Sequence, residues 1–229
     1  MMKTRVLGWV VGLSLLANQA DAVQVDVTVT GQVIFNGIQE PPLSGVGGGS
    51  TMEMTFSVDS NNFVDGVPGD TRGYIIDGSS FAMTFEPSGI TVGLADPFPV
   101  GETPYFTLVD GFPVSDGFFV STFVTSPGGV PLSQDPFNVN LDLGYVGTTL
   151  DSLDILDAVG DYDFAGLTRF GLNLWAFSPS NVAMEMDFAS MSIVAVPEPS
   201  AWVPGCLLGL LGIVHARRVR ARTHRRHVR

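Results

Sequence analysis

Five aspartates fall close together in the second half of the chain: Asp151, Asp154, Asp157, Asp161 and Asp163. Because Ca²⁺ binds six to eight oxygen ligands, Asp154, Asp157, Asp161 and Asp163 are candidate ligands for a calcium site, although their spacing does not match an EF-hand loop. Leucines at every third position, starting at Leu150, predict instead a short helix over residues 150–158. The aspartates would then form its solvated face, so both interpretations stay open.

A second set of carboxylates lies near the end of the apolar alternation. The tripeptide Glu185-Met186-Asp187 resembles the start of the Glu-x-Asp-x-x-Glu motif of laminarinase-like sandwich glycosidases, in which two carboxylates act as nucleophile and acid/base. Ser190 stands where the second catalytic glutamate would be, so the proton donor is missing. A glycoside hydrolase acting through Glu185 is therefore only a third hypothesis, and the sequence favours the polar face of an edge strand.

Thiol and imidazole chemistry is restricted to the C-terminal end of the sequence. Cys206 and the three histidines, His215, His224 and His227, all follow residue 200. The region before them therefore has no Ser-His or Cys-His pair and no ordinary zinc site. We expect a noncatalytic protein without a cofactor, unless Ca²⁺ binds to the aspartates.

The charge of residues 23–195 is strongly negative. Of the 23 acidic residues in the chain, all but Asp21 and Glu198 lie in this region, and Arg72 and Arg169 are its only bases. The twenty-one acids and two bases give a formal charge of −19. Because such a surface repels phosphate backbones, nucleic acid is excluded as a partner.

The N-terminus has the three parts of a secretory signal peptide. Lys3 and Arg5 precede the apolar run of residues 6–17, and Ala20-Asp21-Ala22 supplies a small-x-small cleavage site. Twelve residues span only about 18 Å as a helix, against about 30 Å for the hydrocarbon core of a bilayer. The sequence therefore predicts a cleaved signal peptide at residues 1–22 and an exported domain at 23–195.

The C-terminus combines a proline motif, an apolar segment and a basic tail. Residues 201–216 form a short predicted transmembrane helix, which follows the motif Val196-Pro197-Glu198-Pro199. Basic residues next to an apolar segment stay in the cytoplasm and stop its transfer. The arginines that supply this stop signal are Arg217, Arg218, Arg220 and Arg222, within a longer arginine-rich tail.

The arrangement of residues 196–229 resembles the PEP-CTERM sorting signal, and the N-terminal signal peptide is its expected companion. The resemblance implies recognition by exosortase, a membrane protease-transpeptidase of Gram-negative bacteria that make exopolysaccharide. It also implies removal of the anchor near Pro199. The domain would be exported across the inner membrane and anchored there transiently, then released to the cell surface or the medium.

The region between the two ends alternates apolar and polar residues, as half-buried strands do. Turns rich in Gly, Pro, Asn and Asp separate these segments. The pattern predicts an all-β domain, an antiparallel two-sheet β-sandwich of jelly-roll type with the single short helix. A change of parity in the last segment predicts a β-bulge near Ser190. The expected apolar segments are 23–35, 52–58, 81–85, 90–94, 105–109, 118–124, 137–143, 170–176 and 182–193.

Two noncatalytic functions follow from these observations. The first is a cell-surface or matrix protein that is sorted and processed by exosortase and associates with exopolysaccharide. The second is a Ca²⁺-dependent carbohydrate-binding module. A sugar-binding platform would need exposed aromatic rings, for which the candidates are Tyr105, Phe118, Phe119, Tyr162 and Trp175.

Overall fold

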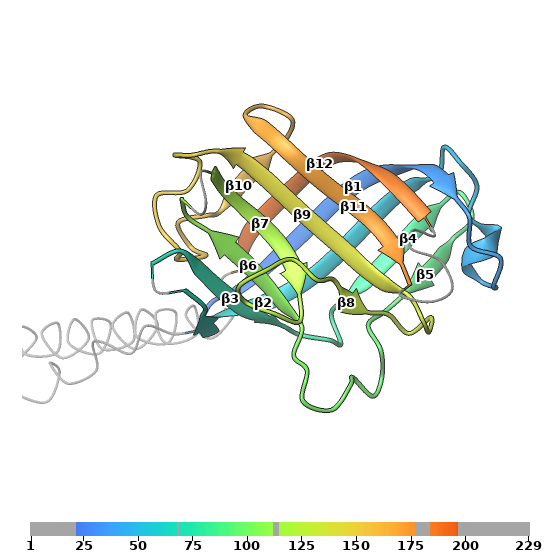
Figure 1. Ribbon diagram of the computed structural model, residues 1–229, viewed down its shortest axis with the longest axis horizontal. Coiled ribbons are helices and arrows are strands. Elements are labelled where there is room, and N and C mark those ends of the chain that lie inside the picture. Colours follow the sequence, from blue (N-terminus) through green and yellow to red (C-terminus); the bar gives the residue numbers. More distant parts are fainter. Residues whose placement is uncertain (1–21, 68, 112–114, 177–183, 197–229) are drawn as a thin grey trace, which may run out of the picture.

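The computed structural model describes residues 22–67, 69–111, 115–176 and 184–196. They form an all-β fold in which eight antiparallel strands close into a barrel, with additional short strands (Figure 1). The predicted signal peptide, the proline motif after Val196, the transmembrane segment and the arginine tail lie outside the described residues. Within the described part, no helix is long and apolar enough to cross a membrane.

The barrel wall follows the order β1, β12, β11, β9, β7, β6, β3, β2, and then returns to β1. The bounds of these strands are β1 Gln24–Asn36, β2 Thr51–Asp65, β3 Thr71–Ile76, β6 Tyr105–Val109, β7 Ser115–Ser121, β9 Asn138–Val146, β11 Leu167–Trp175 and β12 Met184–Val196.

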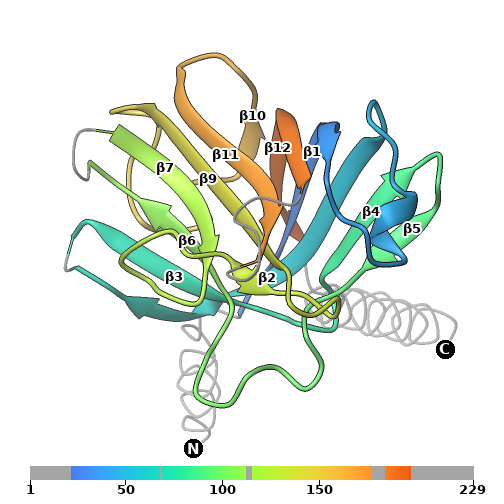
Figure 2. The ribbon, with the colours of Figure 1, turned by 45° about the vertical axis from the view of Figure 1, so that its right-hand side comes forward.

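Four short elements complete the fold. β4 (Ala82–Glu86) pairs with the first half of β2, and β5 (Ile90–Val92) pairs with β4, so the two form a flap beside the barrel (Figure 2). β8 (Val130–Pro131) pairs with β9, and β10 (Gly160–Tyr162) pairs with β12. A single 3₁₀ turn, η1 (Leu43–Gly45), lies in the connection between β1 and β2.

The predicted division into two sheets is wrong, although the all-β class and the antiparallel pairing are confirmed. β1 pairs along its length with both β2 and β12, which leaves no open edge between them. Glycine allows the wall to curve at points of close approach. A Cβ on Gly117 would collide with the carbonyl oxygen of Leu143 in the neighbouring strand β9. A Cβ on Gly31 would collide with the carbonyl oxygen of Asp187 in the neighbouring strand β12.

The apolar residues of the alternating sequence pattern face the interior of the barrel. The side chains of Val25, Val27 and Val29 in β1 are fully buried, and their polar neighbours face outward. Aromatic rings fill the centre: the ring of Phe118 lies 5.8 Å from that of Phe106 and 4.7 Å from that of Tyr162. The interior is therefore a packed core and does not form a channel.

The β-bulge predicted near Ser190 is confirmed. Thr30 of β1 lies opposite Ser190, but the next residue, Gly31, lies opposite Phe188, so Ala189 has no partner. The extra residue moves Met191 and Ile193 to the same buried side as Met184, Met186 and Phe188. The parity change in the sequence thus preserves a single apolar face along β12.

The predicted helix over residues 150–158 is wrong, because this segment folds into consecutive turns. Short polar side chains bind the backbone locally, which competes with helix formation. The Asp154 carboxylate accepts the N–H of Leu156 (2.9 Å), and the Ser152 hydroxyl accepts the N–H of Asp154 (3.0 Å). Ile155 is fully buried, whereas Leu156 is exposed, which does not follow the predicted three-residue period.

The strands define two ends of the barrel. At the terminal end, Gln24 at the start of β1 pairs with Val196 at the end of β12. The connections from β2 to β3, from β6 to β7 and from β9 to β11 also lie there. At the opposite end, called the pocket end below, the chain connects β1 to β2, β5 to β6 and β7 to β9.

Candidate functional site

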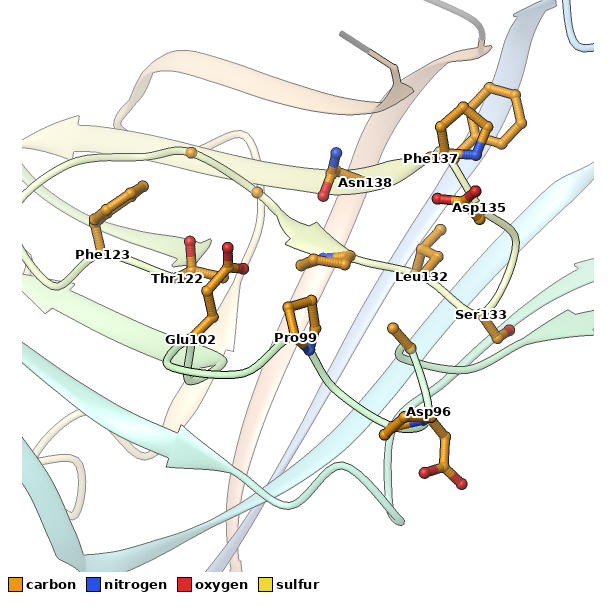
Figure 3. Close-up of a pocket in the computed structure, with 16 residues that line it drawn as sticks. Asp96, Pro99, Glu102, Thr122, Phe123, Leu132, Ser133, Asp135, Phe137 and Asn138 are labelled. Carbon is orange, nitrogen blue, oxygen red and sulfur yellow. The ribbon is translucent and has the colours of Figure 1, made fainter.

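A cavity of about 700 Å³ opens at the pocket end, between the connection of residues 93–104 and that of residues 121–138 (Figure 3). Its volume is in the range of small-molecule sites in proteins, about 300–1,000 Å³. It is lined by Ala95, Asp96, Pro97, Pro99, Glu102, Thr122, Phe123, Gly128, Gly129, Pro131, Leu132, Ser133, Asp135, Pro136, Phe137 and Asn138.

Backbone hydrogen bonds join the two connections. The Ala95 N–H donates to the Pro131 carbonyl (3.0 Å), and the Ser133 N–H donates to the Gly93 carbonyl (3.0 Å). Between them, Leu94 and Leu132 form an isolated β-bridge, and both side chains are buried. The cavity floor is therefore tied to β8 and through it to the barrel wall.

Gly129 determines how the second connection meets the wall. Its φ of +69° lies in the left-handed region that favours glycine, and a Cβ there would approach the Val139 carbonyl oxygen to 2.8 Å. Its carbonyl accepts the Thr122 N–H (3.1 Å), which brings the end of β7 beside β8. This turn places Thr122 and Phe123 on the rim of the cavity.

The Ser133 hydroxyl accepts the Gly93 N–H (3.3 Å), but three other polar side chains of the cavity are not used by the fold. Glu102 lies near Thr122 and Phe123, Asp135 lies toward the other side, and Asn138 lies between them (Figure 3). Within the described residues, the side chains of Glu102, Asp135 and Asn138 have no hydrogen-bond or ion-pair partner. The carboxylate of Asp96 points away from these groups, and Asp96 also borders a neighbouring cavity of about 380 Å³.

The apolar part of the lining consists mainly of rings. The Phe123 side chain is 61% exposed, whereas Phe137 is buried beneath the opposite side. Four prolines add rigid apolar surfaces, and none of the sixteen lining residues is basic. The cavity thus combines an exposed aromatic ring with two free carboxylates and one free amide.

The sequence contains one repeated motif at this site, which its apolar pattern does not reveal. The tripeptide Asp-Pro-Phe occurs twice, at residues 96–98 and 135–137, and the two copies lie in the two connections that form the cavity. None of the cavity residues was a candidate from sequence. The cavity residues did not stand out in the sequence, because Pro and Asp are expected in any loop.

The aspartates at residues 151–163 are not gathered around a cation site. Asp154 binds the backbone of its own turn, Asp163 accepts the Ala165 N–H (2.7 Å), and Asp157 accepts the Ser152 hydroxyl (2.8 Å). Asp161 projects from β10 and is exposed. No group of three or more acidic, histidine or cysteine side chains in the described residues is arranged to hold a metal ion.

The Glu185 tripeptide lies on the outer wall of the barrel. Glu185 and Asp187 are exposed in β12, and Glu185 faces Phe35 of β1 and Asn173 of β11 across the sheet. The Ser190 hydroxyl lies 2.8 Å from that of Thr30, beyond the bulge. None of these residues lines the cavity of residues 93–138.

The aromatic residues expected to form a platform are mostly parts of the wall and core. Phe118 and Phe119 are buried, and Tyr162 packs against Phe118 inside the barrel with its hydroxyl donating to the Ala158 carbonyl (2.7 Å). Tyr105 and Trp175 are half-buried. The exposed ring at the cavity is instead that of Phe123.

At the terminal end, a buried carboxylate organises the connections. Asp116 is 2% exposed and accepts three backbone hydrogen bonds, from Gly111 (3.0 Å), Thr148 (2.8 Å) and Leu150 (2.8 Å). Its charge is thereby compensated by peptide dipoles.

Other acidic groups surround Asp116. Desolvation raises the pKa of Asp110 above its ordinary value, and the nearby carboxylates of Asp116, Asp70 and Asp151 add to this effect.

Of the predicted sorting motif, the structure describes only Val196, the last residue of β12. Pro197, Glu198, Pro199, the membrane segment 201–216 and the stop-signal arginines lie outside the described residues. Comparison of the chain with protein-family models found no matching family, and comparisons with curated proteins and with solved structures found no match either.

Proposed function

We propose that this chain is a noncatalytic protein of the bacterial cell surface or extracellular matrix that is sorted and processed by exosortase and associates with exopolysaccharide. It crosses the inner membrane by its signal peptide and is held transiently by the helix of residues 201–216. The observation that carries the proposal is the pairing of Gln24 with Val196, next to the signal-peptide cleavage site and the proline motif.

This pairing gives both trimmed ends one location on the folded domain. β12 runs to Val196 without a linker, so the proline motif begins where the barrel ends. Because β1 starts beside it, cleavage after Ala22 and cleavage near Pro199 would both leave the barrel wall intact. An anchored domain would then present its terminal end to the membrane and its cavity outward.

The charge of the domain suits this location. Both bases of the described domain are paired, Arg72 with Asp65 (2.6 Å) and Arg169 with Asp142 (2.9 Å), so the remaining acidic groups dominate the surface. A strongly acidic protein stays dispersed through self-repulsion, which favours solubility outside the cell.

Labelling of a single cysteine tests export and location together. Val100, a fully exposed residue near the cavity, is replaced by Cys in a Cys206→Ser background, and cells are treated with a membrane-impermeant maleimide. We expect labelling of intact cells or of the medium. Labelling only after permeabilisation of the outer membrane would indicate a periplasmic protein, and labelling only after lysis would contradict the proposal.

Substitution of the motif tests processing. In Glu198→Ala/Pro199→Ala, the arginine tail should remain attached and the chain should stay in the membrane fraction, as it should in a host that lacks exosortase. The matched control is Glu185→Ala, which changes an exposed acid of β12 and should be trimmed normally. Normal trimming of the motif variant would contradict processing by exosortase.

A further inference from the structure

We infer that the cavity between residues 93–104 and 121–138 binds a saccharide that carries protonated amino groups. This inference rests on the proposed function, because an outward-facing cavity on a matrix protein meets polysaccharide. It extends that function by assigning the site and the class of sugar. Neither the calcium hypothesis nor the Glu185 hypothesis involves these residues.

The charge of the cavity selects against acidic ligands. Glu102 and Asp135 present free carboxylates, Asp96 lies at the border, and no lining residue carries a positive charge. A uronic-acid polymer would meet uncompensated repulsion there. An ammonium group can donate hydrogen bonds to these carboxylates, and charge-assisted bonds of this kind are roughly twice as strong as neutral ones.

The positions of the polar groups suit an extended ligand. Glu102 lies to one side of the cavity and Asp135 to the other, with Asn138 between them (Figure 3). Two amino groups on a short oligosaccharide can therefore reach different carboxylates. The Asn138 amide offers both a donor and an acceptor, which matches sugar hydroxyl groups.

The apolar surfaces favour sugar rings. The prolines present rigid surfaces and the Phe123 ring rotates about only two side-chain bonds, so little conformational entropy is lost when a sugar ring stacks on them. An amino group close to the Phe123 face adds a cation–π attraction.

A basic peptide is the less favoured ligand. Peptides often bind by adding a strand to an open sheet edge, with main-chain hydrogen bonds supplying affinity. The strand at this cavity, β8, has no free edge, because β9 pairs with one side and residues 93–95 bind the other. Because both sides of β8 are already hydrogen-bonded, this strand offers no free main-chain N–H and C=O groups to which a peptide could pair. A basic peptide would therefore have no advantage over another cationic ligand.

Calorimetric titration of the full chain in detergent tests the inference with defined probes: a β-1,4-linked glucosamine hexamer, its fully N-acetylated form, an oligogalacturonate and hexalysine. We expect the glucosamine hexamer to bind at least tenfold more tightly than the N-acetylated form, with no heat from the oligogalacturonate. Equal affinity for the two hexamers, or no binding of either, would overturn the inference.

Variants locate the binding site. Glu102→Gln/Asp135→Asn keeps the side-chain shapes and should weaken glucosamine binding at least tenfold, while Phe123→Ala should weaken both hexamers. The control, Glu53→Gln/Asp187→Asn, removes two exposed charges from the barrel wall and should change affinity less than twofold. An equal loss in the control would show unspecific attraction to an acidic surface, which contradicts a site.

Hexalysine separates a saccharide site from a general cation site. If hexalysine binds as tightly as the glucosamine hexamer and is equally sensitive to Glu102→Gln/Asp135→Asn, the saccharide assignment is wrong. These results are independent of processing. Failure of binding in a correctly exported chain overturns this inference alone, whereas a chain confined to the cytosol overturns the proposed function.

Discussion

The two ends of the barrel use acidic side chains in opposite ways. At the terminal end, Asp116 is buried and receives three backbone N–H groups, and Asp65 pairs with Arg72. At the pocket end, Glu102 and Asp135 have no partner in the described residues. The difference shows that acidity alone does not identify a site. A carboxylate that the fold leaves unsatisfied beside a cavity is available for a ligand.

The largest expected effect comes from removing the buried carboxylate. Asp116→Ala leaves three backbone N–H groups without an acceptor, and each unsatisfied group costs about 1–3 kcal/mol. We expect the free energy of unfolding to fall by at least about 3 kcal/mol in urea titrations. Glu102→Ala, at the other end, should change it by less than about 0.5 kcal/mol. A similar loss of unfolding free energy in both variants would contradict the proposed difference between the two ends of the barrel.

High pH should weaken the aromatic cluster that Tyr145 and Tyr162 form with Phe118 in the core. Burial raises the pKa of Tyr145 and that of Tyr162 to about 12. The neutral phenols are favoured in the folded state, so their contribution is fully present below pH 10 and is lost as the pH rises from about 10 through about 12. Burial also raises the pKa of Tyr74, so ultraviolet titration should show late ionisation of Tyr74, Tyr145 and Tyr162, and Tyr145→Phe should remove one of these groups. Ionisation of all tyrosines near pH 10 would contradict this.

Tyr74 supports the turns that replace the predicted helix. Its hydroxyl donates to the Leu153 carbonyl (2.7 Å) and accepts the Ile155 N–H (2.9 Å). Tyr74→Phe should lower the free energy of unfolding by about 1–3 kcal/mol, because both backbone groups lose their partner. Thr84→Val removes the exposed hydrogen bond between the hydroxyls of Thr84 and Thr91 in the flap, and it should lower the free energy of unfolding by less than about 0.5 kcal/mol. A neutral Tyr74→Phe would show that these turns do not depend on the hydroxyl.

The smallest expected effect is an increase in stability, and it comes from replacing Asp110. Because the pKa of Asp110 is raised, its ionised form is disfavoured in the folded state, and stability falls as the pH rises through the unfolded and then the folded pKa. Asp110→Asn should therefore raise the melting temperature slightly at neutral pH and leave it unchanged at a pH well below 4. A lower melting temperature at neutral pH would contradict the repulsion inferred among these aspartates.

Local features of the fold were predictable from sequence, whereas its closure was not. Alternation located β1 and most of the other long strands, a short apolar run located β6, and the parity change located the bulge at Ala189. Alternation assigns one buried face to each strand but does not say which strands pair. β3 was missed, because Thr71–Ile76 buries residues on both faces and does not alternate.

The candidate site was less predictable than the fold. The aspartates at 151–163 drew attention by their density, yet several of them bind their own turns. Glu102 lies far in sequence from Asp135 and Asn138, and only the pairing around β8 brings the two connections together. A site built by tertiary contacts between loops leaves only a faint local signal, here the repeated Asp-Pro-Phe tripeptide.

Intact mass spectrometry of the mature protein from its native host tests the central claim most directly. The account predicts a polypeptide that begins at Val23 and ends near Pro199, so that both cuts flank the paired ends of β1 and β12. A full-length polypeptide recovered from the cytosol, with the leader and the arginine tail still attached, would contradict it.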